Sequence, residues 1–241
     1  MGHHTAAASL SVVTLIVWAG LLAFAGAYAL AAGCRKRRRW SGRRSVSWYV
    51  GLGLLGLAFA PPLAASAHHD LRAHMVQHLL VGMVAPLALV LAAPLTLALR
   101  TMPVRYARRI VAVLHSQALC WLIHPLSALV LNVGVLYALY LTPLYALSQQ
   151  HIALHLMLHG HMFLAGFLFT SVIAGLDSGA PTARWSTRLA VLFVAIAAMQ
   201  RLLSGCIAAG GRRAAGHDLA QIQAAAQLMY YGGDGPNLFL R

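Results

Sequence analysis

Histidine is the residue type that stands out in this chain, because 13 histidines are set against only four acidic residues, all of them Asp. Two stretches carry histidines four residues apart, which on a helix places them on one face within about 100° of arc. The first stretch holds Asp70, His74, Gln77 and His78, and the second holds His151, His155 and His159. A metal ion needs two or more imidazoles on one side within a few ångströms. The spacing therefore predicts a metal site, and a hydrogen-bonded polar core or a proton path is the alternative.

The residues also bear on which metal such a site would take. Imidazole suits zinc, copper, iron and nickel, whereas thioethers favour Cu(I). Four methionines lie near these histidines in the sequence, namely Met75, Met83, Met157 and Met162. This proximity tilts the prediction toward copper. His161 points away from the other histidines of its stretch on an ideal helix, so it joins the site only if the helix rotates or unwinds locally.

The composition places these histidines in a membrane protein. Hydrophobic residues make up 60% of the chain and charged residues 9%, against roughly 25% charged in a soluble domain. The net charge of +14 does not indicate a nucleic-acid partner, because the Arg residues lie between long apolar runs. Membrane lipid is the expected surrounding. The three cysteines form no Cys-x-x-Cys pair, so neither a disulfide framework nor a thiolate metal site is indicated.

The apolar runs predict an all-α fold, a polytopic transmembrane helix bundle of about six spans that forms a single domain over residues 1–241. An apolar run of about 20 residues is long enough to cross a bilayer as a helix. The third run is too long unless its ends project or the helix tilts. An amphipathic stretch, Arg109–Leu122, is expected along the interface. The predicted spans are Ser9–Ala32, Ser47–Ala67, Leu71–Leu99, Pro125–Leu147, Ile152–Ile173 and Leu189–Ala208.

The positive residues predict the orientation of these spans. The loops after the first, third and fifth spans hold most of the 18 Lys and Arg residues, and loops rich in Lys and Arg are cytoplasmic in membrane proteins. The N-terminus is therefore expected outside the cell, in a multi-pass protein of the plasma membrane. On this topology both histidine stretches begin at the outer face, while His115 and His124 lie on the cytoplasmic side.

Several spaced motifs occur in one order between about Arg72 and Gly205. They include His-Met-Val-Gln-His at residues 74–78, Ala-Pro-Leu-Thr-Leu-Ala-Leu-Arg at residues 93–100, the stretch from His155 to His161, and Gly-Leu-Asp at residues 175–177. In these motifs the chain resembles the CtaG-type integral-membrane cytochrome c oxidase assembly factors. The resemblance implies a function in maturing haem–copper oxidases by helping copper reach the oxidase, with cytochrome c oxidase subunits as partners.

The resemblance also implies a set of metal-binding residues. The positions that match the family are His74, His78, His155 and His161, whereas His151, His159 and Asp70 are predicted from spacing alone. No enzymatic turnover is expected. Two other functions remain open: a membrane zinc hydrolase that uses Asp70 or Asp218 beside three histidines, and a haem b protein with one His ligand from each of the third and fifth spans.

The chain departs from the family pattern in two places. Arg201 stands four residues before Gly205, where the family tends to have a histidine. Members of the family usually have seven spans, but here Gly232-Gly233-Asp234 is followed by only seven residues. Residues 210–241 are therefore interpreted as an outer C-terminal segment, which either ends outside or places Gln221–Tyr231 in the membrane interface.

Overall fold

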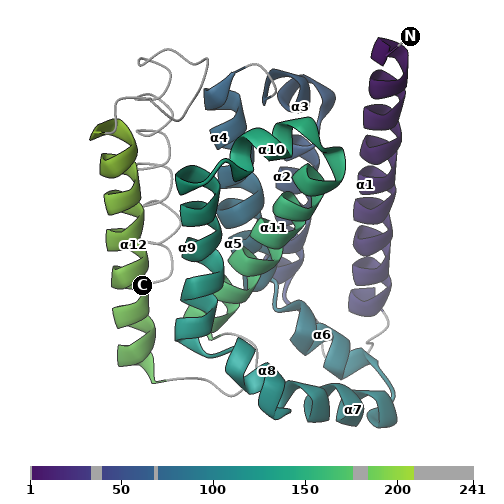
Figure 1. The fold of residues 1–241 in the computed structure, drawn as a ribbon. Coiled ribbons are helices and arrows are strands. Elements are labelled where there is room, and N and C mark those ends of the chain that lie inside the picture. Colours follow the sequence, from purple (N-terminus) through teal and green to yellow (C-terminus); the bar gives the residue numbers. More distant parts are fainter. Residues whose placement is uncertain (1, 34–39, 68–69, 176–183, 209–241) are drawn as a thin grey trace.

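The computed structural model describes residues 2–33, 40–67, 70–175 and 184–208, and the helices of this part pack side by side as a bundle (Figure 1). The described residues contain helices and no strand. The predicted all-α class is therefore confirmed. The C-terminal segment 210–241, on which the expected lack of a seventh span depends, lies outside the described residues.

The helices follow one another with short connections. Their bounds are α1 (Gly2–Gly33), α2 (Gly42–Ala58), α3 (Pro61–Ala67), α4 (Leu71–Leu79), the π-helix η1 (Leu80–Val84), α5 (Ala85–Leu91), α6 (Pro94–Thr101), α7 (Val104–Leu114), α8 (Gln117–Leu122), α9 (Pro125–Leu141), α10 (Leu144–Gln150), α11 (Ile152–Ala174) and α12 (Trp185–Ala208). Helices α4, η1 and α5 form one continuous rod, in which η1 is a single wide turn.

Three helical segments of the described chain are long and apolar enough to cross a membrane. They are Thr14–Gly33, Arg72–Leu91 and Ala153–Ala174. Helices α2 and α3 make a fourth if they are counted as one span bent by 51°. Two shorter apolar helices, Pro125–Leu139 and Trp185–Ala198, lie where the fourth and sixth spans were predicted. A helix thus occupies each predicted position, although fewer than six of the described helices are long enough to cross a membrane.

Besides the bend between α2 and α3, three of the predicted segments are broken in the structure. The third span ends at Leu91, because Ala93 takes a left-handed conformation with φ of 48° before Pro94 starts α6. Helix α9 ends at Leu141 rather than Leu147, just before Pro143. Proline lacks an N–H and disfavours helical geometry in the residue before it. The amphipathic stretch starts earlier than predicted and is divided into α7 and α8 at His115 and Ser116.

Two of the buried clusters in the described part of the chain show how the helices pack. In one, Ala58 of α2 packs with Val81, Ala85 and Leu89 of the η1–α5 rod, and the Ser47 hydroxyl donates a 2.6 Å hydrogen bond to the Ala88 carbonyl. In the other, side chains of α9, α11 and α12 pack together. Burial of apolar area, at roughly 25 cal/mol per Å² where water is displaced, and close packing stabilise such contacts.

Helix α11 crosses the η1 turn at a point where both backbones carry glycine. A Cβ atom on Gly166 would overlap the carbonyl oxygen of Gly82, so only glycine permits this approach. Small residues let transmembrane helices pack closely in this way. π-turns inside helices often occur at functional sites, and η1 begins two residues after His78. The crossing therefore sets how close α11 lies to the histidines of α4.

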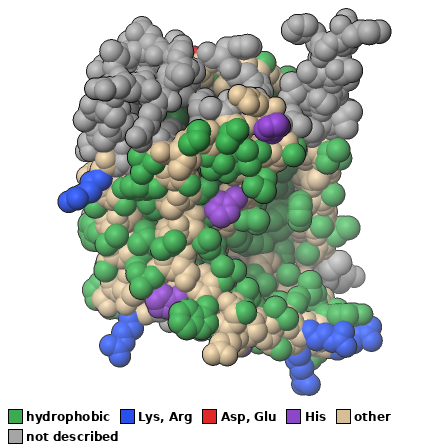
Figure 2. Space-filling view, viewed as in Figure 1, with side chains coloured by type: hydrophobic (Ala, Val, Ile, Leu, Met, Phe, Trp, Pro, Cys, Tyr) green, Lys and Arg blue, Asp and Glu red, His purple; other side chains and the backbone are tan. Residues whose placement is uncertain are grey.

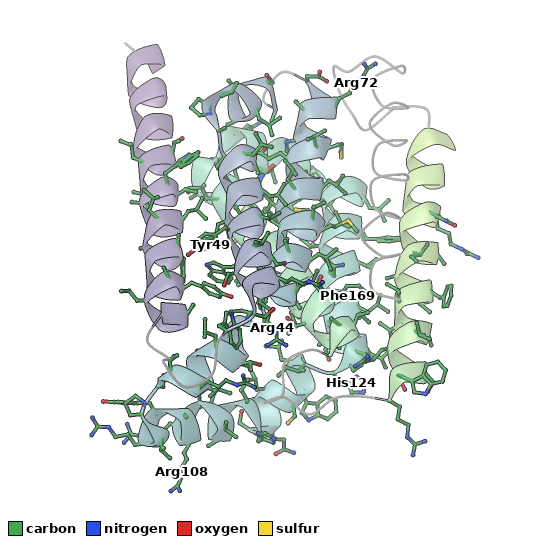
Figure 3. The ribbon with its side chains drawn as sticks, turned by 180° about the vertical axis from the view of Figure 1, so that it is seen from behind. Arg44, Tyr49, Arg72, Arg108, His124 and Phe169 are labelled. Carbon is green, nitrogen blue, oxygen red and sulfur yellow. The ribbon has the colours of Figure 1, made fainter. Side chains whose placement is uncertain are left out.

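The two ends of the bundle differ in charge. Arg72 lies at one end, whereas Arg108 and His124 lie at the other (Figure 3). The second end, which we call the basic end, carries Arg44, Arg100, Arg105, Arg108, Arg109, Arg184 and Arg188. The guanidinium groups of Arg44 and Arg100 both lie over the Trp40 ring, at 5.0 and 5.8 Å from its centroid.

Candidate metal-binding cluster

Helix α4 positions the first two histidines inside the bundle. Asp70 is its N-cap, and the Asp70 carboxylate accepts a 2.8 Å hydrogen bond from the backbone N–H of Arg72. His74 and His78 follow one and two turns later and are almost fully buried, with 2% and 5% of their surface exposed. Their Nε2 atoms lie 2.7 Å apart. The four-residue spacing therefore brings two imidazoles into direct contact.

Helix α11 supplies two more imidazoles to the same place. The His159 ring stacks on the His78 ring with centroids 5.1 Å apart, and the His155 ring lies 4.3 Å from that of His159. The His74 ring lies 6.4 Å from His155 and 6.3 Å from His159. His159 is buried and His155 is half-buried. We call His74, His78, His155 and His159 the imidazole cluster.

The tautomer of His159 follows from its hydrogen bond. Its Nδ1 lies 3.0 Å from the carbonyl oxygen of His155, and a carbonyl only accepts, so Nδ1 carries the proton. The lone pair of a neutral His159 ring is then on Nε2. Metal-binding histidines are commonly oriented by this kind of Nδ1–H bond to a backbone carbonyl.

One ring nitrogen of His78 lacks the hydrogen bond that buried polar atoms normally make. Its Nδ1 atom is buried and has no hydrogen-bond partner in the described part of the chain. Leaving a buried polar atom unsatisfied costs about 1–3 kcal/mol, and such atoms often mark a binding or catalytic role. The cluster therefore contains a buried polar nitrogen that close packing alone does not explain.

The bend between α2 and α3 covers the cluster. The Gln77 side-chain amide donates a 2.9 Å hydrogen bond to the carbonyl of Ala58, and the Phe59 ring centroid lies 6.1 Å from that of His159. The Gln77 hydrogen bond fixes α4 against α2, which holds His74 and His78 in place indirectly.

The structure separates the other predicted ligands from the cluster. His151 is exposed at the N-terminus of α11, and Asp70 is engaged as the cap of α4. His161 lies on another face of α11, with Nε2 3.3 Å from the carbonyl of Leu131 on α9. Metal binding by these three residues stays a prediction. Arg201, four residues before Gly205, is exposed on α12.

The imidazole cluster is a set of neighbouring rings and not a finished coordination site. Within the described ranges, no three His, Cys, Asp or Glu side chains are arranged so that they could hold a metal ion directly. The Gly82–Gly166 crossing, on which the arrangement depends, was not predicted from the sequence. Its signal is a glycine near the middle of each of the two apolar helices that carry the histidines.

Comparison with known proteins identifies relatives over most of the chain. Proteins of Mycobacterium bovis and Mycobacterium tuberculosis, both described only as uncharacterized, are each 32% identical to it over 188 residues, or 75% of this chain and 28% of theirs. A Mycobacterium leprae protein, also described as uncharacterized, is 28% identical over 166 residues, or 66% of this chain and 25% of its own. The chain thus spans about a quarter of the length of these curated relatives. No solved structure matches it.

The family profile covers more of the chain than any of these pairwise matches. The profile described as cytochrome c oxidase caa3 assembly factor matches residues 26–240. The match includes both helices of the imidazole cluster, the basic end and the crossing of α11 with η1. The chain belongs to the family of cytochrome c oxidase caa3 assembly factors.

Proposed function

We propose that this chain binds copper through the imidazole cluster and passes it to cytochrome c oxidase during assembly. The observation that carries the proposal is the meeting of four imidazoles from α4 and α11, three of them buried. Buried polar side chains within a membrane span are costly and usually mark a functional site. The family supplies the target, because its members are assembly factors for an oxidase of the caa3 type.

A small ring movement would let His74 and His78 bind one metal ion together. Two imidazole nitrogens bonded to one tetrahedral metal at 2.0–2.1 Å lie about 3.3 Å apart, whereas the Nε2 atoms of His74 and His78 are 2.7 Å apart. The two rings therefore need to separate by only a fraction of an ångström. Copper would then replace the hydrogen bond between them, and the donor ring would carry its proton on Nδ1.

The chemistry near the cluster favours copper over zinc hydrolysis. The Met162 side chain packs beside Gly82, which lies one helical turn beyond His78. Imidazole with thioether suits Cu(I). A hydrolytic zinc site would use a carboxylate, but Asp70 is the one acid among the described residues, and its carboxylate already caps α4.

Copper content of the purified chain tests the site. After loading with Cu(I), the His74→Ala/His78→Ala variant is expected to lose most of the bound copper, because two of the four imidazoles are gone. The His115→Ala variant is the control, since His115 is exposed at the basic end, and it should keep the wild-type stoichiometry. Elemental analysis measures copper and zinc together, and an absorption spectrum detects haem. Wild-type copper stoichiometry in the double variant would show that these two histidines are not the site.

We further propose that the cluster faces the outside of the cell and the basic end faces the cytoplasm, since positive loops are retained inside. Two exposed serines report the two ends: Ser66 on α3 and Ser41 before α2. In a background with the three native cysteines changed to Ala, Ser66→Cys is expected to react with an impermeant thiol reagent on intact cells. Ser41→Cys should react only after permeabilisation. The reverse pattern would place the cluster on the cytoplasmic side.

A further inference from the structure

A second site lies at the basic end of the bundle. A cavity of about 790 Å³ opens beside α11, with walls from the foot of α9 and from α8. Most of its lining is apolar, including Leu122, Leu164 and Leu168. In α11 it extends down to Gly175, the left-handed residue that ends the helix. An apolar hollow of this size at the edge of a membrane span fits hydrocarbon.

A cation, Arg188, lies against Gly175, one of the residues that line this cavity. The guanidinium of Arg188 packs so closely on Gly175 that a Cβ there would overlap it. The Nε atom of Arg188 is buried without a hydrogen-bond partner in the described part of the chain. Its charge is favourable beside the C-terminus of α11, but a planar guanidinium normally binds an oxyanion through paired hydrogen bonds.

The surroundings of the cavity are positive as well. Arg105, Arg108 and Arg109 are exposed on α7, which precedes the α8 wall. Figure 2 shows hydrophobic side chains spread over the described part of one face of the molecule, with most of the visible Lys and Arg residues at its lower edge. Basic pockets between transmembrane helices bind the head groups of anionic lipids.

We propose that this cavity binds an anionic phospholipid, with its phosphate on Arg188 and an acyl chain along Leu164 and Leu168 of α11. The apolar volume and the adjoining half-buried cation match the two parts of such a lipid. The site is at the opposite end of the bundle from the imidazole cluster and does not depend on copper. The lipid would fill the space between α8 and α11 and hold the end of α11 to the start of α12.

Haem is another amphiphile with acidic groups, and two histidines line the same cavity, His124 and His161. Both rings already have partners. His161 Nε2 lies 3.3 Å from the Leu131 carbonyl, and His124 Nδ1 accepts a 3.3 Å hydrogen bond from the Leu126 N–H as the cap of α9. The structure therefore favours a lipid, and haem becomes an outcome of the test.

The test measures which lipids the full chain retains. The purified protein is exposed to micelles that contain equal amounts of phosphatidylglycerol and phosphatidylcholine with the same acyl chains, and native mass spectrometry counts the bound lipids. The wild type is expected to retain phosphatidylglycerol preferentially. Arg188→Gln should lower this preference roughly fivefold, the effect typical of one basic residue at an anionic membrane. The matched control is Arg184→Gln, which removes an exposed cation one turn earlier.

A second pair of variants tests the cavity without changing charge. Leu164→Trp replaces a branched aliphatic side chain in the cavity by a bulky ring system and should reduce retention of both lipids. Leu126→Trp makes the same change at an exposed position of α9 outside the cavity lining and should have no effect. Equal retention of both lipids by the wild type overturns the proposal, as do equal effects within either pair. A haem absorption band that His161→Ala abolishes would assign the cavity to haem instead.

Discussion

Cells that carry the His74→Ala/His78→Ala variant in place of the wild-type chain are expected to contain cytochrome c oxidase polypeptides but little oxidase activity. The reason is that the variant lacks the two buried imidazoles that contact each other at the centre of the cluster. Oxidase subunits would still be made and inserted, but their copper centres would fill poorly. Oxidase activity per mole of oxidase polypeptide, and copper per oxidase, are the measurements.

The same cells provide internal controls. A copper-independent terminal oxidase should keep its activity, and His115→Ala at the basic end should behave as wild type. Added copper is expected to restore part of the lost activity, because mass action can replace a carrier when the receiving site is accessible. Full copper occupancy of the oxidase in the variant under copper limitation would contradict a role in copper delivery. Equal damage from His115→Ala would show that the effect does not belong to the imidazole cluster.

The periodicity of the sequence was enough to predict that histidines share helix faces, which is the basis of the imidazole cluster. The four-residue spacing of His74 and His78 and of His155 and His159 placed each pair on one helical face, and the structure turns both faces toward each other. His161, which also lies on α11, shows where the resemblance to the family stops being a guide. His161 matched the family motif and His159 did not, yet His159 lies in the cluster, because two residues on a helix are separated by about 200°.

Breaks in the helices were harder to predict, because tertiary packing decides where an apolar run stops. The stretch from Leu79 to Leu99 is apolar apart from Thr96, and Ala93 is an unusual residue for a left-handed conformation, which costs an L-residue about 1–2 kcal/mol. Its burial at 1% exposure holds it in that conformation. The π-turn after His78 likewise leaves no mark in residue type. It depends on the fit of η1 against α2 and α11, which no local pattern contains.

The approach of α11 to η1 leads to the second large effect, which is expected from one added methyl group. In Gly166→Ala the new Cβ would overlap the Gly82 carbonyl oxygen, and backbone on both sides leaves no flexible side chain to move aside. Overpacking of this kind typically costs about 1–3 kcal/mol. Helix α11 must then move away from η1, which carries His155 and His159 away from His74 and His78. Copper affinity should fall by at least the roughly tenfold that follows loss of a second-shell contact.

Gly160 and Gly82 provide controls, because replacing either glycine by alanine adds the same methyl group as Gly166→Ala. Gly160→Ala adds the same methyl group to α11 where nothing lies within 4 Å, so only the small gain in helix propensity remains. Gly82→Ala changes the other side of the same crossing, where the new Cβ would meet Met162 atoms at 3.9 and 4.0 Å, an ordinary contact. Both variants should keep wild-type copper affinity, and Gly166→Ala alone should lose it together with several degrees of thermal stability. Copper titration and melting in detergent measure the two effects. If Gly166→Ala binds copper as tightly as Gly160→Ala does, the crossing does not set the geometry of the cluster.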